Sequence, residues 1–87
     1  MRPQDLYPGI GALTNRVAGL ADELAIARVD CETWDPAALR VDAGSGWDAA
    51  ETHAAVVDDL AGAEEALRLA LGRLEAAWSA LGRLAGD

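Results

Sequence analysis

Two side chains in this sequence could serve as a nucleophile, a general base or a soft metal ligand: Cys31 and His53, each the single residue of its type. A catalytic thiol needs a base beside it, and a zinc site needs several ligands at usable spacing. The chain has no paired cysteines and no second histidine, and Glu51, two residues before His53, lies on a different helix face. We therefore expect no catalytic residue, no metal site and no cofactor, and a protein that is not an enzyme.

Both residues fit packing roles. Cys31 continues an apolar stripe and is expected to be a small buried residue, with an intermolecular disulfide as the alternative. His53 falls near the start of a second stripe, where we expect its ring to pack at the boundary. The alternative is a pH-sensitive contact to Asp30 or Glu32 on the facing helix.

Carboxylates are the third group that could carry a function. The 87 residues include 15 acidic and 7 basic side chains, which gives a net charge of −8. This balance excludes a general nucleic-acid binder and a protein that docks on an anionic membrane face, because both need excess cations. Most of the carboxylates lie between residues 30 and 65, where Arg40 is the only base. They form either a solvated face or a surface for a basic partner, whose candidate residues are Asp58, Asp59, Glu64 and Glu65.

The elements that position these residues are helical. Alanine and leucine dominate the composition, whereas phenylalanine is absent and β-branched residues are scarce, which predicts an all-α fold. Apolar residues spaced alternately by three and four predict a first helix over about 9–33, with Pro8 in its first turn. This first stripe consists of Ile10, Leu13, Val17, Leu20, Leu24, Ala27 and Cys31.

A long second helix over about 48–85 follows an irregular connection, residues 34–47. Pro36 ends the first helix, and Asp35 can cap one short helical turn. Asp48 and Glu51 have the spacing of a capping box. Beyond them, leucines recur every seven residues, with further apolar residues alongside, which indicates a broad face for helix packing: Leu60, Leu67, Leu71, Leu74, Trp78, Leu81 and Leu84.

The lengths of the two helices predict a partner chain. At 1.5 Å per residue the second helix spans roughly 55 Å and the first about 37 Å. An antiparallel hairpin then leaves the stretch from Leu74 to Leu84 uncovered, including Trp78, and a second chain would complete the bundle. The alternative is a kink near Gly72 that folds the end back as a third helix. The predicted interface comprises the second-helix residues just named together with Leu13, Val17, Leu20 and Leu24.

The turn resembles a known family. The run Gly46-Trp47-Asp48-Ala49-Ala50 between two amphipathic helices resembles the small Trp-x-Gly helical hairpins exported by type VII (ESX-type) secretion systems. The resemblance implies that Trp47, Asp48 and Ala49 form the turn motif, and that two hairpins pair into a four-helix bundle that is exported as a unit. Ala49 stands where that family has glycine, and no Tyr-x-x-x-Asp/Glu signal follows the second helix. The composition, rich in Ala and Arg and without Lys, resembles that of high-GC actinobacterial proteins.

These observations favour a single helical domain, residues 1–87, that acts as a protein–protein interaction module. It would form half of a homo- or hetero-oligomeric bundle, as a type VII secretion substrate or its co-secreted partner. The alternatives are an acidic inhibitor of the immunity or antitoxin type, and a small structural or assembly subunit. The chain has no Sec-type signal and no spanning segment, so we expect it to be made in the cytoplasm, with export by another route left open.

Overall fold

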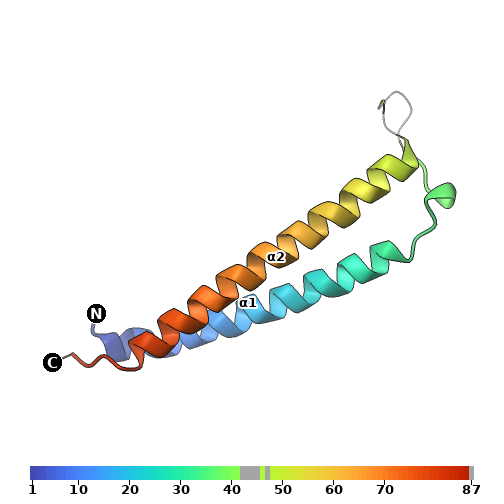
Figure 1. Ribbon diagram of the computed structural model, residues 1–87. Helices are drawn as coiled ribbons and strands as arrows, with labels where there is room; N and C mark the ends of the chain where they lie inside the picture. The colour runs from blue at the N-terminus through green and yellow to red at the C-terminus, as the bar shows by residue number, and fades with distance from the viewer. Residues whose placement is uncertain (42–45, 47, 87) are drawn as a thin grey trace.

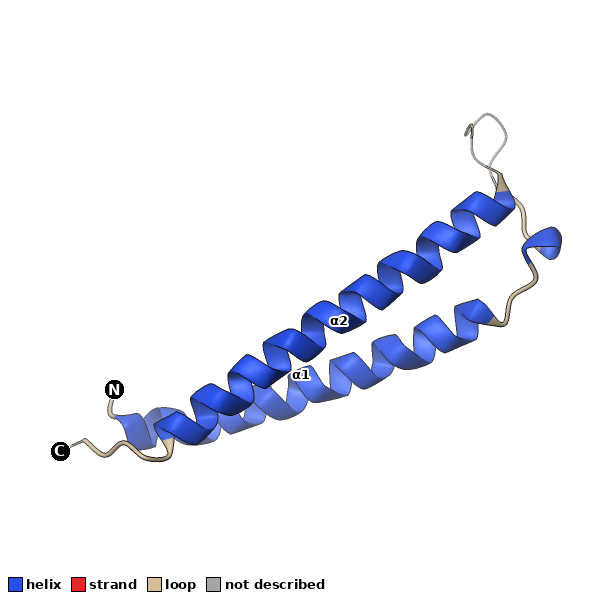
Figure 2. Cartoon of the chain, in the orientation of Figure 1, coloured by secondary structure: helices blue, strands red, loops and turns tan. Residues whose placement is uncertain are grey.

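The computed structural model describes residues 1–41, 46 and 48–86 and shows two long antiparallel helices (Figure 1). Helix α1 spans Pro3–Glu32 and helix α2 spans Ala49–Leu81. The connection contains one short 3-10 helix, η1, at Pro36–Ala38. Over the described residues the secondary structure is helix and loop, without strands (Figure 2). The predicted all-α helical hairpin is confirmed.

Helix α1 begins six residues earlier than the sequence analysis predicted. Pro3 occupies the first turn, where a missing N–H costs nothing, and the carboxylate of Asp5 accepts a hydrogen bond from the backbone N–H of Arg2 at 3.2 Å. Pro8, which we had placed in the first turn, lies inside the helix. A proline so near the N-terminus interrupts one backbone hydrogen bond, and the helix continues past it.

The capping residues lie where the sequence placed them. The side chain of Asp48 accepts a hydrogen bond from the N–H of Glu51 at 2.6 Å, and that of Asp35 accepts one from Ala37 at 3.0 Å. Helix α2 ends at Leu81, four residues before the predicted end, with Gly82 as its C-cap. Leu84 therefore lies in the tail after the helix and not on its apolar face.

The hairpin is elongated and has a narrow seam in place of a compact core. Its radius of gyration is 19.4 Å, and it measures 64 × 23 × 14 Å. A compact chain of this length would have a radius of gyration of about 12 Å. Among the described residues, none of the large side chains is fully buried, and the buried positions are small ones: Gly11, Thr14, Ala21 and Cys31.

The seam of α1 differs by one residue from the predicted stripe. Thr14, Ala21 and Arg28 turn toward α2, where the sequence analysis had placed Leu13, Leu20 and Ala27. Ile10, Val17 and Leu24 lie half-buried beside them and belong to both the predicted stripe and the observed seam. Small residues at the seam let the helix backbones approach closely, which a row of leucines would prevent. The displaced leucines are left exposed on one flank.

Candidate interaction surface

Trp78 packs inside the hairpin at the end that holds both chain termini. Its ring lies against Gly11, so near that a Cβ added to this glycine would be 2.7 Å from Cζ2. The Tyr7 ring covers it at a centroid distance of 5.4 Å. We had predicted that Trp78 lies beyond the reach of the first helix and contacts a partner. The part that concerns reach is wrong, because α1 starts at Pro3 and extends over this part of α2, whereas contact with a partner stays a prediction.

The tail after α2 is tied to the start of α1. The Gln4 side-chain amide pairs with the backbone of Gly86: its Nε2 donates to the Gly86 carbonyl at 2.8 Å, and its Oε1 accepts from the Gly86 N–H at 3.1 Å. Gly82 lies against the Tyr7 ring and Gly86 against the Pro3 ring. The terminal end of the hairpin is therefore closed by this chain's own residues: Leu74, Trp78 and Leu81 are half-buried, while Leu84 stays 61% exposed.

Charged side chains bridge the helices near the middle of the seam. Arg28 Nε donates to Glu64 at 2.8 Å, and its Nη1 pairs with Glu32 at 2.8 Å. Arg68 adds weaker contacts to Glu64 at 3.4 Å and to Asp22 at 3.7 Å. The hydrogen bond from Arg28 holds the pKa of the Glu64 carboxyl below its usual range, and Glu64 in turn raises the pKa of Arg28.

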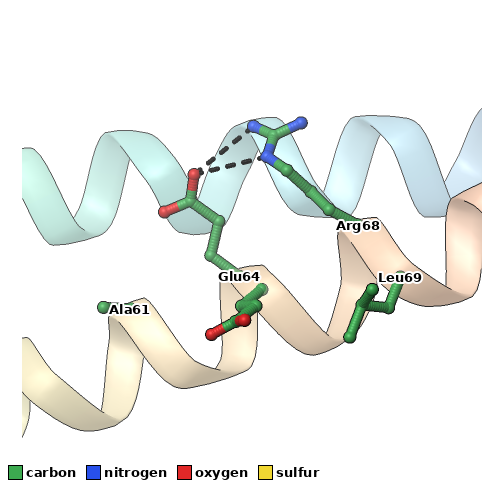
Figure 3. A pocket seen from close by; sticks show the side chains of 5 residues that line it. Ala61, Glu64, Arg68 and Leu69 are labelled. Atoms are coloured by element: carbon green, nitrogen blue, oxygen red, sulfur yellow. Dashed lines mark hydrogen bonds and ion pairs between the residues drawn. The ribbon is translucent and has the colours of Figure 1, made fainter.

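Figure 3 shows how this polar group sits on α2: Glu64 and Arg68 point toward α1, whereas Leu69 points away from it. Glu64 is thus engaged within the chain, although the sequence analysis grouped it with residues for a basic partner. The other members of that group, Asp58, Asp59 and Glu65, are exposed.

A side-chain hydrogen bond joins the two helices near the connection. The ring of His53 lies 2.6 Å, through Nε2, from the carbonyl oxygen of Cys31, in the last turn of α1. The Trp34 ring lies beside it at a centroid distance of 6.4 Å. Cys31 is buried, as expected. Of the predicted turn motif, Asp48 is the cap and Ala49 the first residue of α2, while Trp47 lies outside the described residues.

An apolar face runs along one side of the hairpin. Leu6, Leu13 and Leu20, seven residues apart, are 41%, 41% and 50% exposed. Leu13 and Leu20 each come directly before a buried residue of the seam, whereas Asp22 comes directly after the buried Ala21. Successive residues are rotated by 100° about the helix axis. The leucines and Asp22 therefore flank the seam on opposite sides. The Asp22–Arg68 ion pair marks the side away from the leucines, where Ile26 and Val29 are also exposed, at 71% and 51%.

Helix α2 completes this apolar face. Arg68 comes directly after Leu67, a half-buried residue of the seam, and marks the side of α2 that holds the ion pair. Residues that come directly before a seam residue therefore lie on the opposite side of α2. They are an exposed row of small residues: Val56, Ala63, Ala70 and Ala77. The predicted leucines of α2 are half-buried, since α1 covers a part of each: Leu60, Leu67, Leu71, Leu74 and Leu81.

Leu6 was missed by the sequence analysis because the helix was started too late. Its spacing of seven from Leu13 is the signal that would have found it. We name the combined surface, Leu6, Leu13 and Leu20 of α1 with the alanine row and leucines of α2, the apolar face.

The comparisons with known proteins add no relative. No family model, no curated protein and no solved structure matches the chain. Among the described residues, no group of three or more His, Cys, Asp or Glu side chains could hold a metal ion. Neither described helix combines the length and the apolar character needed to cross a bilayer.

Proposed function

We propose that this chain is a non-enzymatic protein–protein interaction module, a helical hairpin that forms half of a bundle with another helical chain. One observation carries the proposal: the buried positions are small residues, while leucines at heptad spacing remain half-exposed along one side. A face of this kind buries its leucines when a second pair of helices packs on it.

The exposed area supports the same proposal. The chain exposes 6202 Å², whereas a compact monomer of 9.0 kDa would expose about 4,850 Å². The surplus is roughly 1,350 Å², and a specific interface of standard size buries about 800 Å² on each partner. An interface of standard size on one side of the hairpin would therefore bury the greater part of this surplus.

The experiment compares two charged substitutions on α1. Leu20→Asp places a carboxylate on the apolar face, at a side chain that is half-exposed within the hairpin. Ile26→Asp is the matched control, because Ile26 is 71% exposed and lies one turn after Asp22, on the side of the seam away from the leucines. Sedimentation equilibrium should show that Leu20→Asp dissociates the complex formed by the parent chain, while Ile26→Asp leaves it intact. If the two variants affect the complex equally, the proposal is refuted.

The setting we propose for this pairing is type VII-type secretion, with the chain as a substrate or a co-secreted partner. What supports it is the hairpin layout with Asp48 and Ala49 at the start of α2, next to Trp47 in the sequence. Replacing Trp47 by alanine should leave pairing unchanged and abolish export from a host that carries such a system. Export of this variant at the parent level would contradict the assignment.

A second candidate function is inhibition of a basic partner by an acidic module. It is favoured by the exposed carboxylates at the connection half of the hairpin, among them Asp58, Asp59 and Glu65. Such a complex would be electrostatic and would not depend on Leu20.

A further inference from the structure

Charge is distributed unevenly along the hairpin. Residues 22–65 carry twelve carboxylates and two arginines, whereas the rest of the chain carries three carboxylates and five arginines. Residues 22–65 make up the half of the hairpin that contains the connection, and both termini lie at the opposite end (Figure 1). A molecule 64 Å long is therefore strongly acidic in one half and slightly basic in the other.

The exposed row on α1 is symmetric about its own centre. It reads Leu6, Leu13, Leu20 and Ala27 at intervals of seven. If two copies of α1 run antiparallel with this row at the contact, Leu13 lies opposite Leu20 of the partner subunit and Leu6 opposite Ala27 of the partner subunit. A two-fold axis between residues 16 and 17 generates both pairings at once, as an isologous interface requires.

We propose that the apolar face is occupied by a second copy of this chain, laid head to tail so that α1 packs on α1 and the acidic half of each copy meets the basic half of the other. This inference rests on the proposed pairing function and adds the identity and direction of the partner. The surplus of roughly 1,350 Å² per chain exceeds the 800 Å² or so per partner that a stable dimer needs.

Charge selects this direction over the parallel one. A parallel pair would stack two acidic halves along their whole length, with packed helices 8–10 Å apart. That spacing is close to the Debye length of about 8 Å at physiological ionic strength, so the repulsion is only partly screened. The head-to-tail pair sets the carboxylates of the acidic half against the terminal end of the other copy, which carries Arg2 and Arg83.

The test measures distances between spin labels on the two copies. In a Cys31→Ala background, a single cysteine is introduced at Asn15 or at Asp30, both exposed and outside the apolar face, and is labelled with a nitroxide. The head-to-tail register offsets the two Asn15 labels by about 5 Å along the bundle axis and the two Asp30 labels by about 40 Å. Pulsed dipolar spectroscopy should therefore give a distance on the order of 20 Å longer for Asp30 than for Asn15.

Each outcome decides. An Asp30 distance no longer than the Asn15 distance would mean a parallel pair and would overturn the proposed direction. The absence of any dipolar signal, with sedimentation of a monomer, would overturn the second copy as the occupant. If that monomer still binds a co-expressed helical chain and loses it with Leu20→Asp but not with Ile26→Asp, the proposed function stands without this inference. If the monomer binds no such chain, both are overturned.

Discussion

Replacing Gly11 by alanine tests the closest approach of the two helices. A Cβ at this position would lie 2.7 Å from Cζ2 and 2.9 Å from Cε2 of Trp78. Carbon atoms in contact are separated by about 3.5–4.0 Å, so the indole or the helix must move by roughly 1 Å. Overpacking of this kind costs about 1–3 kcal/mol, against a gain of up to about 1 kcal/mol from replacing glycine in a helix.

Gly19→Ala is the matched control, because the same glycine-to-alanine change on the same helix meets no atom within 4 Å. It should stabilise the hairpin by about 0.5–1 kcal/mol, and the two variants should differ by the overpacking cost alone, about 1–3 kcal/mol. Urea unfolding followed by circular dichroism at one protein concentration measures both. In a Trp78→Ala background, Gly11→Ala should lose its penalty, since the clashing ring is gone. If Gly11→Ala stabilises the parent chain as much as Gly19→Ala does, Trp78 does not pack where we describe it.

Three further predictions concern the cap, the ion pair and the partner. Asp48→Ala should lower the free energy of unfolding by about 1 kcal/mol in urea titrations, because the N–H of Glu51 loses its acceptor, whereas Asp48→Asn should cost much less. Because the pKa of Glu64 is lowered, its contribution to the stability of the hairpin is complete above its ordinary value of about 4.5 and is lost as pH falls through the folded value. The melting temperature should therefore fall less steeply with decreasing pH for Glu64→Gln than for the parent. The apolar contribution to pairing should change little as salt rises from about 0.05 M to 0.5 M, and the opposed charges of the two copies should add only a shallow weakening; a steep loss would favour the acidic inhibitor.

The sequence was sufficient to predict the class of fold and the two caps. Leucines repeating every seven residues required a long second helix, and Pro36 required a break between the helices. The capping residues Asp35 and Asp48 could be located because a side-chain oxygen before a helix has one main use. These are local features, and each is set by residues within one or two turns of it.

Hydrophobicity alone could not predict which row of α1 residues turns toward α2. The pattern of large apolar residues is centred on Leu13 and Leu20, and a hydrophobic scale favours turning them inward. The hairpin instead turns Thr14 and Ala21 toward α2, since small residues permit the close contact of Gly11 with Trp78. Which of two neighbouring rows faces inward depends on the partner helix, and that information is not local.

The Arg28–Glu64 pair offers a last test of what sets the register of the two helices. Glu64 occupies the seam position that Val57, Leu71 and Trp78 fill elsewhere on α2, so a polar contact replaces an apolar one at this level. Arg28→Leu alone leaves the Glu64 carboxylate without its main donor and should lower the melting temperature. The double variant Arg28→Leu/Glu64→Leu should recover it or exceed the parent, because well-packed leucines avoid the desolvation of two charges. If the pair instead fixes the register, hydrogen exchange of the double variant should be faster at the ends of both helices despite the higher melting temperature. A double variant as unstable as Arg28→Leu would show that the pair stabilises the hairpin in its own right, and would contradict the expected recovery of the melting temperature.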